Sequence, residues 1–238
     1  QIPMNIDLKT DFQLALLRNF SHCHPDILFP RQASPTSRYY SQNRYFGDGD
    51  ATILFCMMRH FKPTRLIEVG SGFSSALILD VNEKFFDNRM ELTFIEPNTD
   101  RLLGLLSEVD QENCTLIDAQ VQTVSRHIFE SLDENDILFI DSSHVVKVGS
   151  DVTHILFKIL PSLKAGVIIH FHDILWPFEY PEDWVMRGIS WNEAYFLQAF
   201  LSFNDSFEIL YFNSYIAECF PNELEQSFSS SIKDTGGS

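Results

Sequence analysis

Three titratable residues stand at the end of an apolar stretch, in the segment AGVIIHFHDILWPF that begins at residue 165. They are His170, His172 and Asp173. Burying a histidine or a carboxylate is costly unless the group is paired or used, so their position needs an explanation. Three readings fit these residue types: a general base, a set of metal ligands, or polar groups that are satisfied inside the core.

Acidic residues also stand at the ends of the other apolar runs of the chain. Four of the five runs end in an acid, and the first run carries an acid one residue before its end: Glu68, Glu96, Asp118, Asp141 and Asp173. In open parallel α/β sheets, ligands bind beyond the carboxyl ends of the strands. We therefore predict a ligand site at these positions, although acids there can also cap the following helices.

The elements that position these residues follow from hydrophobic periodicity. Short apolar runs predict strands at 65–69, 92–96, 114–118, 136–141 and 166–171. Amphipathic segments predict helices at 11–20, 50–61, 74–86, 100–109, 121–131, 150–163 and 191–203. Apolar strands that alternate with helices predict a mostly parallel sheet covered on both faces, which is a doubly wound α/β fold. Two later runs, FEILYF (207–212) and SYIAECF (214–220), bring the predicted sheet to seven strands.

The chain divides into three predicted parts. Residues 1–60 form a cap or lid of helix and loop, residues 61–221 form the α/β domain, and residues 222–238 form a loose polar tail. The cap contains the loop RYYSQNRYF, whose rings at Tyr39, Tyr40 and Phe46 are candidates for stacking on a ligand.

The composition of the chain limits the kinds of partner that it can bind. The 238 residues carry 17 basic and 33 acidic side chains, a formal charge of -16, which disfavours nucleic acid and anionic membrane surfaces. No stretch has the length of a membrane span, and the amino terminus lacks a secretory signal. Four separated cysteines without a CxxC pair predict reduced thiols and a cytoplasmic protein. The 22 phenylalanines permit a homodimer.

A glycine loop follows the first strand, in the segment EVGSGFSSALILD. Gly70 and Gly72 allow a sharp turn and close approach of the backbone to a ligand, and Ser74 or Ser75 caps the next helix. A dinucleotide loop would have a third glycine where Ser75 stands. An acid at Glu68 disfavours an anionic pyrophosphate and favours a cationic ligand.

These features resemble the class I S-adenosylmethionine-dependent methyltransferases, whose first motif is an acid followed by two glycines at alternate positions. The resemblance spans residues 50–212 and implies a Rossmann-like methyltransferase fold with S-adenosyl-L-methionine as methyl donor. The cofactor-binding residues that it implies are Glu68, Gly70, Ser71, Gly72, Ser74, Glu96, Asp118, Ala119 and Asp141. Ser74 stands where many relatives have a third glycine, as in small-molecule O-methyltransferases.

Roles carry over from the family residue by residue. Glu68 helps to hold the methionine ammonium group through water or backbone. Glu96 binds the two ribose hydroxyls, while Asp118 and Ala119 meet the adenine.

In this family the fourth and fifth strands border the transferred methyl group, so the resemblance implies a catalytic set of Asp141, His172 and Asp173. Either His172 is the general base, or the three residues hold a divalent metal ion. Metal-dependent relatives usually place a second Asp or Asn after the fifth-strand acid, whereas Ile174 follows here. A mixed set of histidine and carboxylates suits manganese, iron or zinc better than magnesium.

Strand geometry limits how these groups can meet. Alternation puts His170 and His172 on one side of the strand, so the three catalytic residues converge only if the chain turns at Asp173. We predict that His170 is a satisfied core histidine. His144 is as consistent with a surface or helix-capping role as with catalysis, and Glu193 is a further candidate. Five aromatic residues either line an acceptor pocket or simply pack: Trp176, Phe178, Tyr180, Trp184 and Trp191.

The sequence therefore predicts a methyltransferase that acts on a small-molecule acceptor, with the hydroxyl of a sugar or natural product as the favoured acceptor group. Two alternatives stay open: an NAD-type oxidoreductase, and a non-catalytic partner subunit with a methyltransferase fold.

Overall fold

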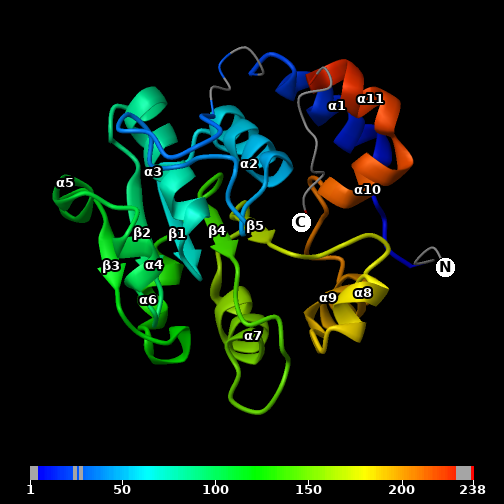
Figure 1. Cartoon of the computed structure of the whole chain (residues 1–238). Helices are drawn as coiled ribbons and strands as arrows, with labels where there is room; N and C mark the ends of the chain where they lie inside the picture. Colours follow the sequence, from blue (N-terminus) through cyan, green and yellow to red (C-terminus); the bar gives the residue numbers. More distant parts are fainter. Residues whose placement is uncertain (1–4, 24–25, 27–28, 229–236) are drawn as a thin grey trace.

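The computed structural model describes residues 5–23, 26, 29–228 and 237–238. At its centre lies a five-stranded parallel sheet in the order β3-β2-β1-β4-β5 (Figure 1). The strands are β1 (Arg65–Val69), β2 (Glu91–Ile95), β3 (Thr115–Ile117), β4 (Ile137–Ile140) and β5 (Ile168–Phe171). The predicted α/β class and parallel sheet are confirmed.

Helices connect and surround the strands. Before and within the first half of the sheet are α1 (Thr10–Phe20), α2 (Asp48–Phe61), α3 (Phe73–Phe86), α4 (Asp100–Leu103), α5 (Glu108–Glu112), η2 (Val121–Thr123) and α6 (Arg126–Glu130). After β4 come α7 (Asp151–His154), η3 (Ile155–Ile159), η4 (Leu160–Ser162), α8 (Glu182–Met186), α9 (Glu193–Ser202), α10 (Asn213–Cys219) and α11 (Pro221–Phe228). In the described residues, no helix has the length and apolar character that a membrane span requires.

The sheet is buried on both faces because its strands are apolar at successive positions. In β1, Leu66 joins a core that includes Phe55 of α2, whereas Ile67 joins a second core that includes Phe129 of α6 and Val152 of α7. Side chains alternate between the faces of a strand, so each strand supplies both cores. The carboxyl ends of all five strands consequently lie along one edge of the sheet.

The predicted count of seven strands is wrong for the described residues. The run 207–212 is irregular, and its last residue, Phe212, donates its backbone N–H to the buried side-chain oxygen of Gln13 at 2.8 Å. The run 214–220 lies mostly in helix α10, where Tyr215 and Ile216 are buried. A short apolar run can be either a strand or a buried helical turn. In these two runs, contacts with distant parts of the chain determine which structure forms.

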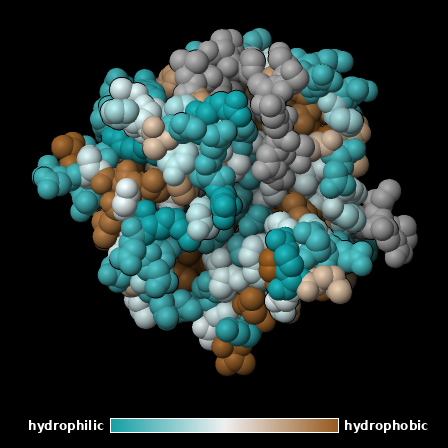
Figure 2. Space-filling view, in the orientation of Figure 1, coloured by the Kyte–Doolittle hydropathy of each residue, from teal (hydrophilic) through white to brown (hydrophobic). Residues whose placement is uncertain are grey.

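Two features of the fold concern the predicted parts of the chain, which remain a prediction. Helix α2 packs in the same core as the sheet, although the sequence groups it with the cap. Helix α11 extends to Phe228, into the segment predicted as a loose tail, and residues 229–236 lie outside the described residues. The face of the molecule in Figure 2 is largely hydrophilic, with hydrophobic residues in small separate groups. The homodimer remains a prediction.

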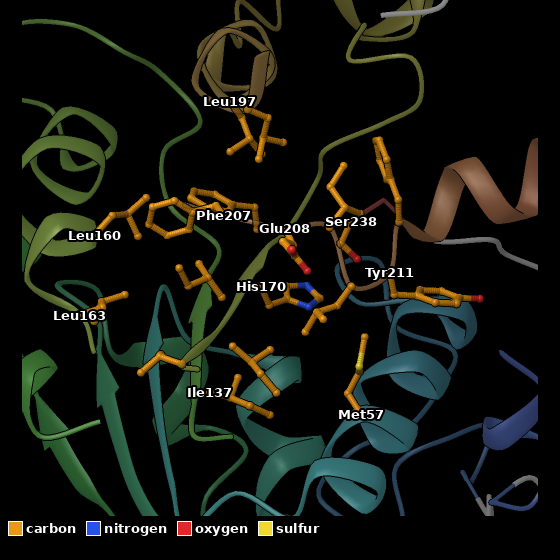
Figure 3. A pocket seen from close by; sticks show the side chains of 18 of the residues that line it. Met57, Ile137, Leu160, Leu163, His170, Leu197, Phe207, Glu208, Tyr211 and Ser238 are labelled. Atoms are coloured by element: carbon orange, nitrogen blue, oxygen red, sulfur yellow. The ribbon is translucent and has the colours of Figure 1, made fainter. Parts of the chain in front are cut away.

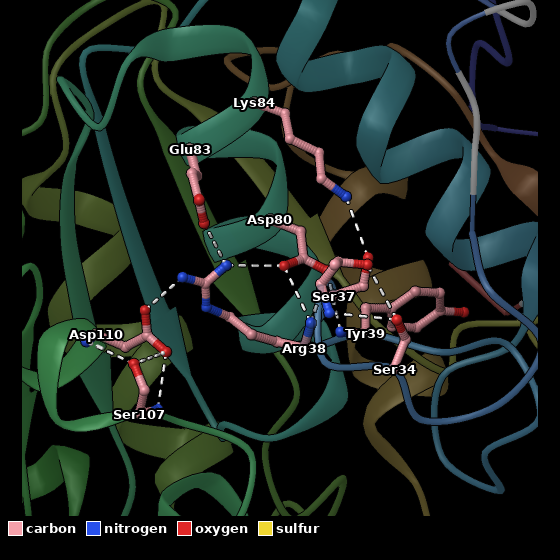
Figure 4. A network of polar contacts seen from close by, with 10 residues as sticks. Ser34, Ser37, Arg38, Tyr39, Asp80, Glu83, Lys84, Ser107 and Asp110 are labelled. Atoms are coloured by element: carbon pink, nitrogen blue, oxygen red, sulfur yellow. Dashed lines mark hydrogen bonds and ion pairs between the residues drawn. The ribbon is translucent and has the colours of Figure 1, made fainter.

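An ion-pair network fastens the loop before α2 to the sheet domain (Figure 4). The guanidinium of Arg38 contacts Asp80 at 2.9 Å and Glu83 at 2.7 Å, both on α3, and also Asp110 on α5. Asp80 further accepts the backbone N–H groups of Arg38 and Tyr39. The carboxylates of Asp80 and Asp110 are buried, so they depend on this one cation.

Replacing Arg38 by methionine should therefore lower the free energy of unfolding by about 3 kcal/mol, because two buried carboxylates lose their partner. Urea denaturation measures the change. The control is Arg126→Met, which removes an exposed pair with Glu130 and should cost no more than about 0.5 kcal/mol. Equal, small losses in both variants would show that the network does not hold the loop.

Candidate functional site

The glycine loop is pressed against the end of the neighbouring strand. Gly70 has φ +84°, and a Cβ built on it would lie 1.7 Å from the carbonyl oxygen of Asp141. The Asp141 N–H in turn donates to the carbonyl of Val69 at 2.8 Å. Only glycine fits this position, since it has a positive φ and no room for a side chain. The close approach places the loop after β1 beside the first residue after β4.

Glu68 lies beneath this loop and is fully buried. Its carboxylate accepts a short hydrogen bond from the Ser75 hydroxyl, which itself accepts the Gly72 N–H at 2.9 Å. Burial raises the pKa of Glu68 to about 8, against the lowering effect of hydroxyls that include those of Ser74 and Ser75. Glu68 thus shapes the loop from below, and its influence on a ligand passes through the backbone of the loop.

The other predicted cofactor residues follow along the same edge. The carboxylate of Glu96, at the end of β2, accepts the Ser71 N–H at 3.0 Å and the Asn98 N–H at 2.7 Å. Asp118 and Ala119 directly follow β3, and the Asp118 side chain is exposed. The structure therefore joins Glu96 to the glycine loop directly, and it puts Asp118 and Ala119 at the next strand end.

Asp141, His172 and Asp173 form a second cluster at the ends of β4 and β5. One potential ligand atom from each lies within 4.8 Å of the others, which is compact enough to surround one ion. Asp173 has φ +57°, so the chain turns there and brings its carboxylate to the side of His172. This turn is the condition that the sequence set for convergence of the three residues.

His144 belongs to this cluster, although the sequence left its role open. Its Nε2 lies 3.2 Å from Asp141 and 3.8 Å from Asp173, and its Nδ1 lies 3.0 Å from Glu193. The ring is buried and packs on Trp191 with centroids 4.2 Å apart. His144 is therefore held between a buried glutamate and the two carboxylates of the cluster.

Charge inside the cluster is balanced by histidines. Burial disfavours protonation of His144, but Asp141 and Glu193 outweigh it and raise the pKa of His144 to about 10. Burial alone would raise the pKa of Asp141. The neighbouring histidines outweigh burial and hold this pKa below its ordinary range. With no other cation bound, His144 is an imidazolium that neutralises part of this acidic site.

Asp50 is a site residue that the sequence did not reveal. The sequence predicts it only as the first residue of a helix, but α2 begins at Asp48, and the buried Asp50 carboxylate lies 4.0 Å from Nδ1 of His172. His172 itself is 3% exposed and packs against Phe46 and Phe139. The one local indication of a role for Asp50 was its position at the start of a predicted helix that is mostly apolar.

His170 departs from its predicted role. It stacks on Phe139 with centroids 4.2 Å apart, which places it in the core as expected. Its Nε2 has no hydrogen-bond partner in the described part of the chain, so the prediction of a satisfied histidine is wrong. Burial lowers the pKa of His170 to about 3, and the ring is neutral.

The aromatic residues frame the two clusters. Tyr39 and Phe46 are buried in the core, so they are not positioned to stack on a ligand. Tyr45 instead stacks on Phe73 at the start of α3, with Arg101 4.0 Å above its ring. Of the five aromatic residues after β5, Trp191 packs on His144, and Tyr180 and Trp184 both contact Trp191.

Three comparisons relate this chain to known proteins. A protein of Archaeoglobus fulgidus, described as uncharacterized, is 42% identical over 101 residues, which cover 42% of this chain and 44% of that protein. The match thus spans less than half of that relative. A solved structure described as cmcI-N160 SAH aligns with 16% identity over 68% of this chain and 79% of that chain, with a TM-score of 0.42. Residues 67–174, which contain both clusters, match the family model of a methyltransferase domain. That match confirms the resemblance to class I S-adenosylmethionine-dependent methyltransferases.

The two glycines of the loop should respond differently to alanine. Gly70→Ala forces a methyl group into the Asp141 carbonyl and should lower the free energy of unfolding by about 3 kcal/mol or more. Gly72→Ala meets only the flexible side chain of Arg101, at 3.2 Å, and should cost less than about 1 kcal/mol. Chemical denaturation of both variants checks this order, and a reversed order would contradict the described contact.

The buried Glu68 should also make stability depend on pH. Its pKa is raised from 4.5 to about 8, so its contribution is complete below pH 4.5 and is lost as the pH rises through 8. Relative to Glu68→Gln, the wild type should lose on the order of 4 kcal/mol between pH 4.5 and pH 8. Parallel stability curves for the two proteins over this range would mean that Glu68 is ionised throughout.

Proposed function

We propose that this protein transfers a methyl group from S-adenosyl-L-methionine to a hydroxyl oxygen of a small-molecule acceptor. The observation that carries the proposal is the contact between Gly70 and Asp141, because it joins a donor loop to a cluster suited to activate an acceptor. Neither half alone is specific. A glycine loop occurs in many nucleotide-binding proteins, and acidic clusters occur without catalysis.

The donor half is supported by the arrangement along β1, β2 and β3. Backbone N–H groups of Ser71 and Gly72 lie in the loop, Glu96 is within reach of the same loop, and Asp118 follows at the next strand. When bound, the donor supplies a methyl group activated by a positively charged sulfur. The acidic edge formed by Asp141 and its neighbours favours that positive charge.

The acceptor half has the donors for a divalent ion. Asp141, His172 and Asp173 supply two carboxylates and one imidazole, and Nε2 of His172 lies 3.8 Å from the Asp173 carboxylate. This set fits manganese, iron or zinc better than magnesium. A divalent ion held there would lower the pKa of an acceptor hydroxyl. Because His172 is almost fully buried, we assign it to the metal rather than to the acceptor proton.

His144 is the residue that we assign to the acceptor proton. Glu193 fixes its Nδ1, so Nε2 faces the site between Asp141 and Asp173. In the transfer, the acceptor oxygen would bond to the methyl carbon as the carbon–sulfur electron pair returns to sulfur. The positive charges of a bound sulfonium and divalent ion would favour the neutral form of His144, whose Nε2 would then take the proton of the hydroxyl. Aromatic residues such as Trp191 exclude water from behind this histidine.

A hydroxyl acceptor is favoured because it needs this assistance. A neutral amine is already nucleophilic, whereas an alcohol must lose or share its proton in the transition state. We include a cytoplasmic location in the proposal, since Cys23, Cys56, Cys114 and Cys219 are all free thiols.

The test measures conversion of S-adenosylmethionine to S-adenosylhomocysteine with a panel of sugar and phenolic acceptors, with Mn²⁺ and with chelator. With an acceptor that turns over, Asp141→Asn should reduce kcat/KM by about 100-fold or more. The matched control is Asp183→Asn, which removes an exposed carboxylate on α8 and should leave turnover unchanged.

Three outcomes would contradict the proposal. Undiminished turnover in Asp141→Asn would remove the assigned site. Tight binding of a nicotinamide dinucleotide, without binding of S-adenosylhomocysteine, would favour the oxidoreductase. Binding of the donor without turnover on any acceptor would favour the non-catalytic partner subunit.

A further inference from the structure

Two of the free cysteines meet where the end of α1 packs against α2. Cys23 lies in the turn after α1 and is half-buried, whereas Cys56 stands in the middle of α2 and is fully buried. The carbonyl oxygen of Phe20, the last residue of α1, accepts the Cys23 N–H at 2.8 Å. The Sγ of Cys56 donates to the same oxygen at 3.9 Å. One backbone oxygen therefore holds both cysteines beside each other.

A second contact fixes the same turn to α2. Arg59 follows Cys56 by three positions, so the two side chains lie on one face of the helix. The Arg59 guanidinium pairs with the Asp26 carboxylate at 3.1 Å, and the Asp26 N–H donates to the Cys23 carbonyl at 3.0 Å. The backbone on both sides of Cys23 is thus attached to α2, which keeps the two thiols together.

The two thiols differ in how a small molecule from solvent can reach them. Met57, the next residue of α2, points into the apolar cavity beside β5 (Figure 3). Successive side chains of a helix point about 100° apart, and the contact with Phe20 shows that Cys56 faces α1. Because Cys56 is fully buried there and Cys23 is only half-buried, a soluble reagent meets Cys23 first.

The thiols also differ in acidity, although they are in hydrogen-bond contact. The hydrogen bond with Cys56 lowers the pKa of Cys23 to about 7, and the positive charge of Arg59 acts in the same direction, against the effect of burial. Burial raises the pKa of the Cys56 thiol far above its ordinary range, and the contact with Cys23 raises it further. Cys23 is therefore partly a thiolate at neutral pH, while Cys56 stays a thiol.

We propose that Cys23 and Cys56 form a peroxide-reactive pair, in which oxidation produces a reversible disulfide between α1 and α2. Cys23 is the attacking residue because it is accessible and lies beside Arg59, and Cys56 is the resolving residue because it is buried against Cys23. An accessible thiolate next to a resolving cysteine is the arrangement of redox-sensing cysteines. The inference does not rest on methyl transfer.

The reaction balances with hydrogen peroxide as the oxidant. The Cys23 thiolate attacks one peroxide oxygen, the oxygen–oxygen bond breaks, and Cys23 becomes a sulfenic acid. The hydroxide that leaves takes up the proton that Cys23 released. The Cys56 sulfur then attacks the Cys23 sulfur and displaces a second hydroxide, which leaves as water with the Cys56 proton. Two thiols lose two electrons and two protons, and one peroxide is reduced to two waters.

Simple packing does not explain this pair. A structural cysteine is buried in apolar surroundings, which describes Cys56 but not Cys23, whose neighbour Arg59 is charged. Cys219 provides the contrast, because it is more exposed than Cys23, yet burial and the charge of Glu218 raise its pKa. Exposure alone therefore does not make a reactive thiol in this chain, and Cys219 is a suitable reference.

The experiment treats the reduced protein with hydrogen peroxide at neutral pH, alkylates the remaining thiols with N-ethylmaleimide, and maps the peptides by mass spectrometry without a reducing agent. Peptides joined through Cys23 and Cys56 should appear, about 2 Da lighter than the two reduced peptides together because two thiol hydrogens are lost. Dithiothreitol should reverse the link. Loss of the Cys23 thiol should be at least ~5-fold faster than loss of the Cys219 thiol.

Single substitutions assign the two steps. In Cys56→Ala, oxidation should stop at the sulfenic acid of Cys23, which dimedone labels, whereas the matched control Cys219→Ala should form the Cys23–Cys56 link as the wild type does. In Cys23→Ser, Cys56 should stay reduced. Oxidation of Cys23 in the wild type without the linked peptide would overturn the inference. Equal loss of the Cys23 and Cys219 thiols, or oxidation of Cys56 in Cys23→Ser, would overturn the assignment of Cys23 as the attacking residue.

Discussion

The crowding of carboxylates at one edge of the sheet is the constraint on which the rest of the structure depends. Glu68, Asp141, Asp173 and Glu193 all lie near the carboxyl ends of β1, β4 and β5, and Glu68 and Glu193 are buried. Buried negative charges are tolerated only when they are protonated, paired or bound to a cation. The protein uses the first two solutions: burial keeps Glu68 largely protonated, and His144 pairs with Asp141 and Glu193.

This balance explains why the site suits positively charged partners. A sulfonium donor and a divalent ion would both relieve the repulsion that the histidines now offset in part. The contact of Gly70 with the Asp141 carbonyl couples binding of the donor to binding of the ion, because the glycine loop lies directly against the acidic cluster. Asp50 extends the same acidic region to His172, and its carboxylate also accepts the N–H of Gly237.

Local patterns were sufficient to predict much of the fold. The run RLIEV corresponds to β1 residue for residue, and the acids at the strand ends lie along one edge as expected. Patterns failed after β5, where apolar runs read as strands become an irregular segment and helix α10. Those residues are held by distant partners such as Gln13, which sequence periodicity cannot reveal.

The candidate site shows the same division. The residues after the strands were predictable because parallel strands fix where their ends lie. The pairing of His144 with Glu193 and the approach of Asp50 to His172 were not, because each joins separate elements and depends on the final packing. The sequence showed that the three residues converge only if the chain turns at Asp173, but it did not show that the chain turns there. A positive φ at an aspartate has no clear signal in the sequence.

The most direct measurement of the central claim is calorimetric titration of the protein with S-adenosylhomocysteine, beside the Glu96→Ala variant. We expect binding at a single site, weakened at least ~10-fold in the variant because no Glu96 carboxylate would accept the ribose hydroxyls. No binding to the wild-type protein at millimolar ligand, or equal affinity in the two proteins, would contradict it.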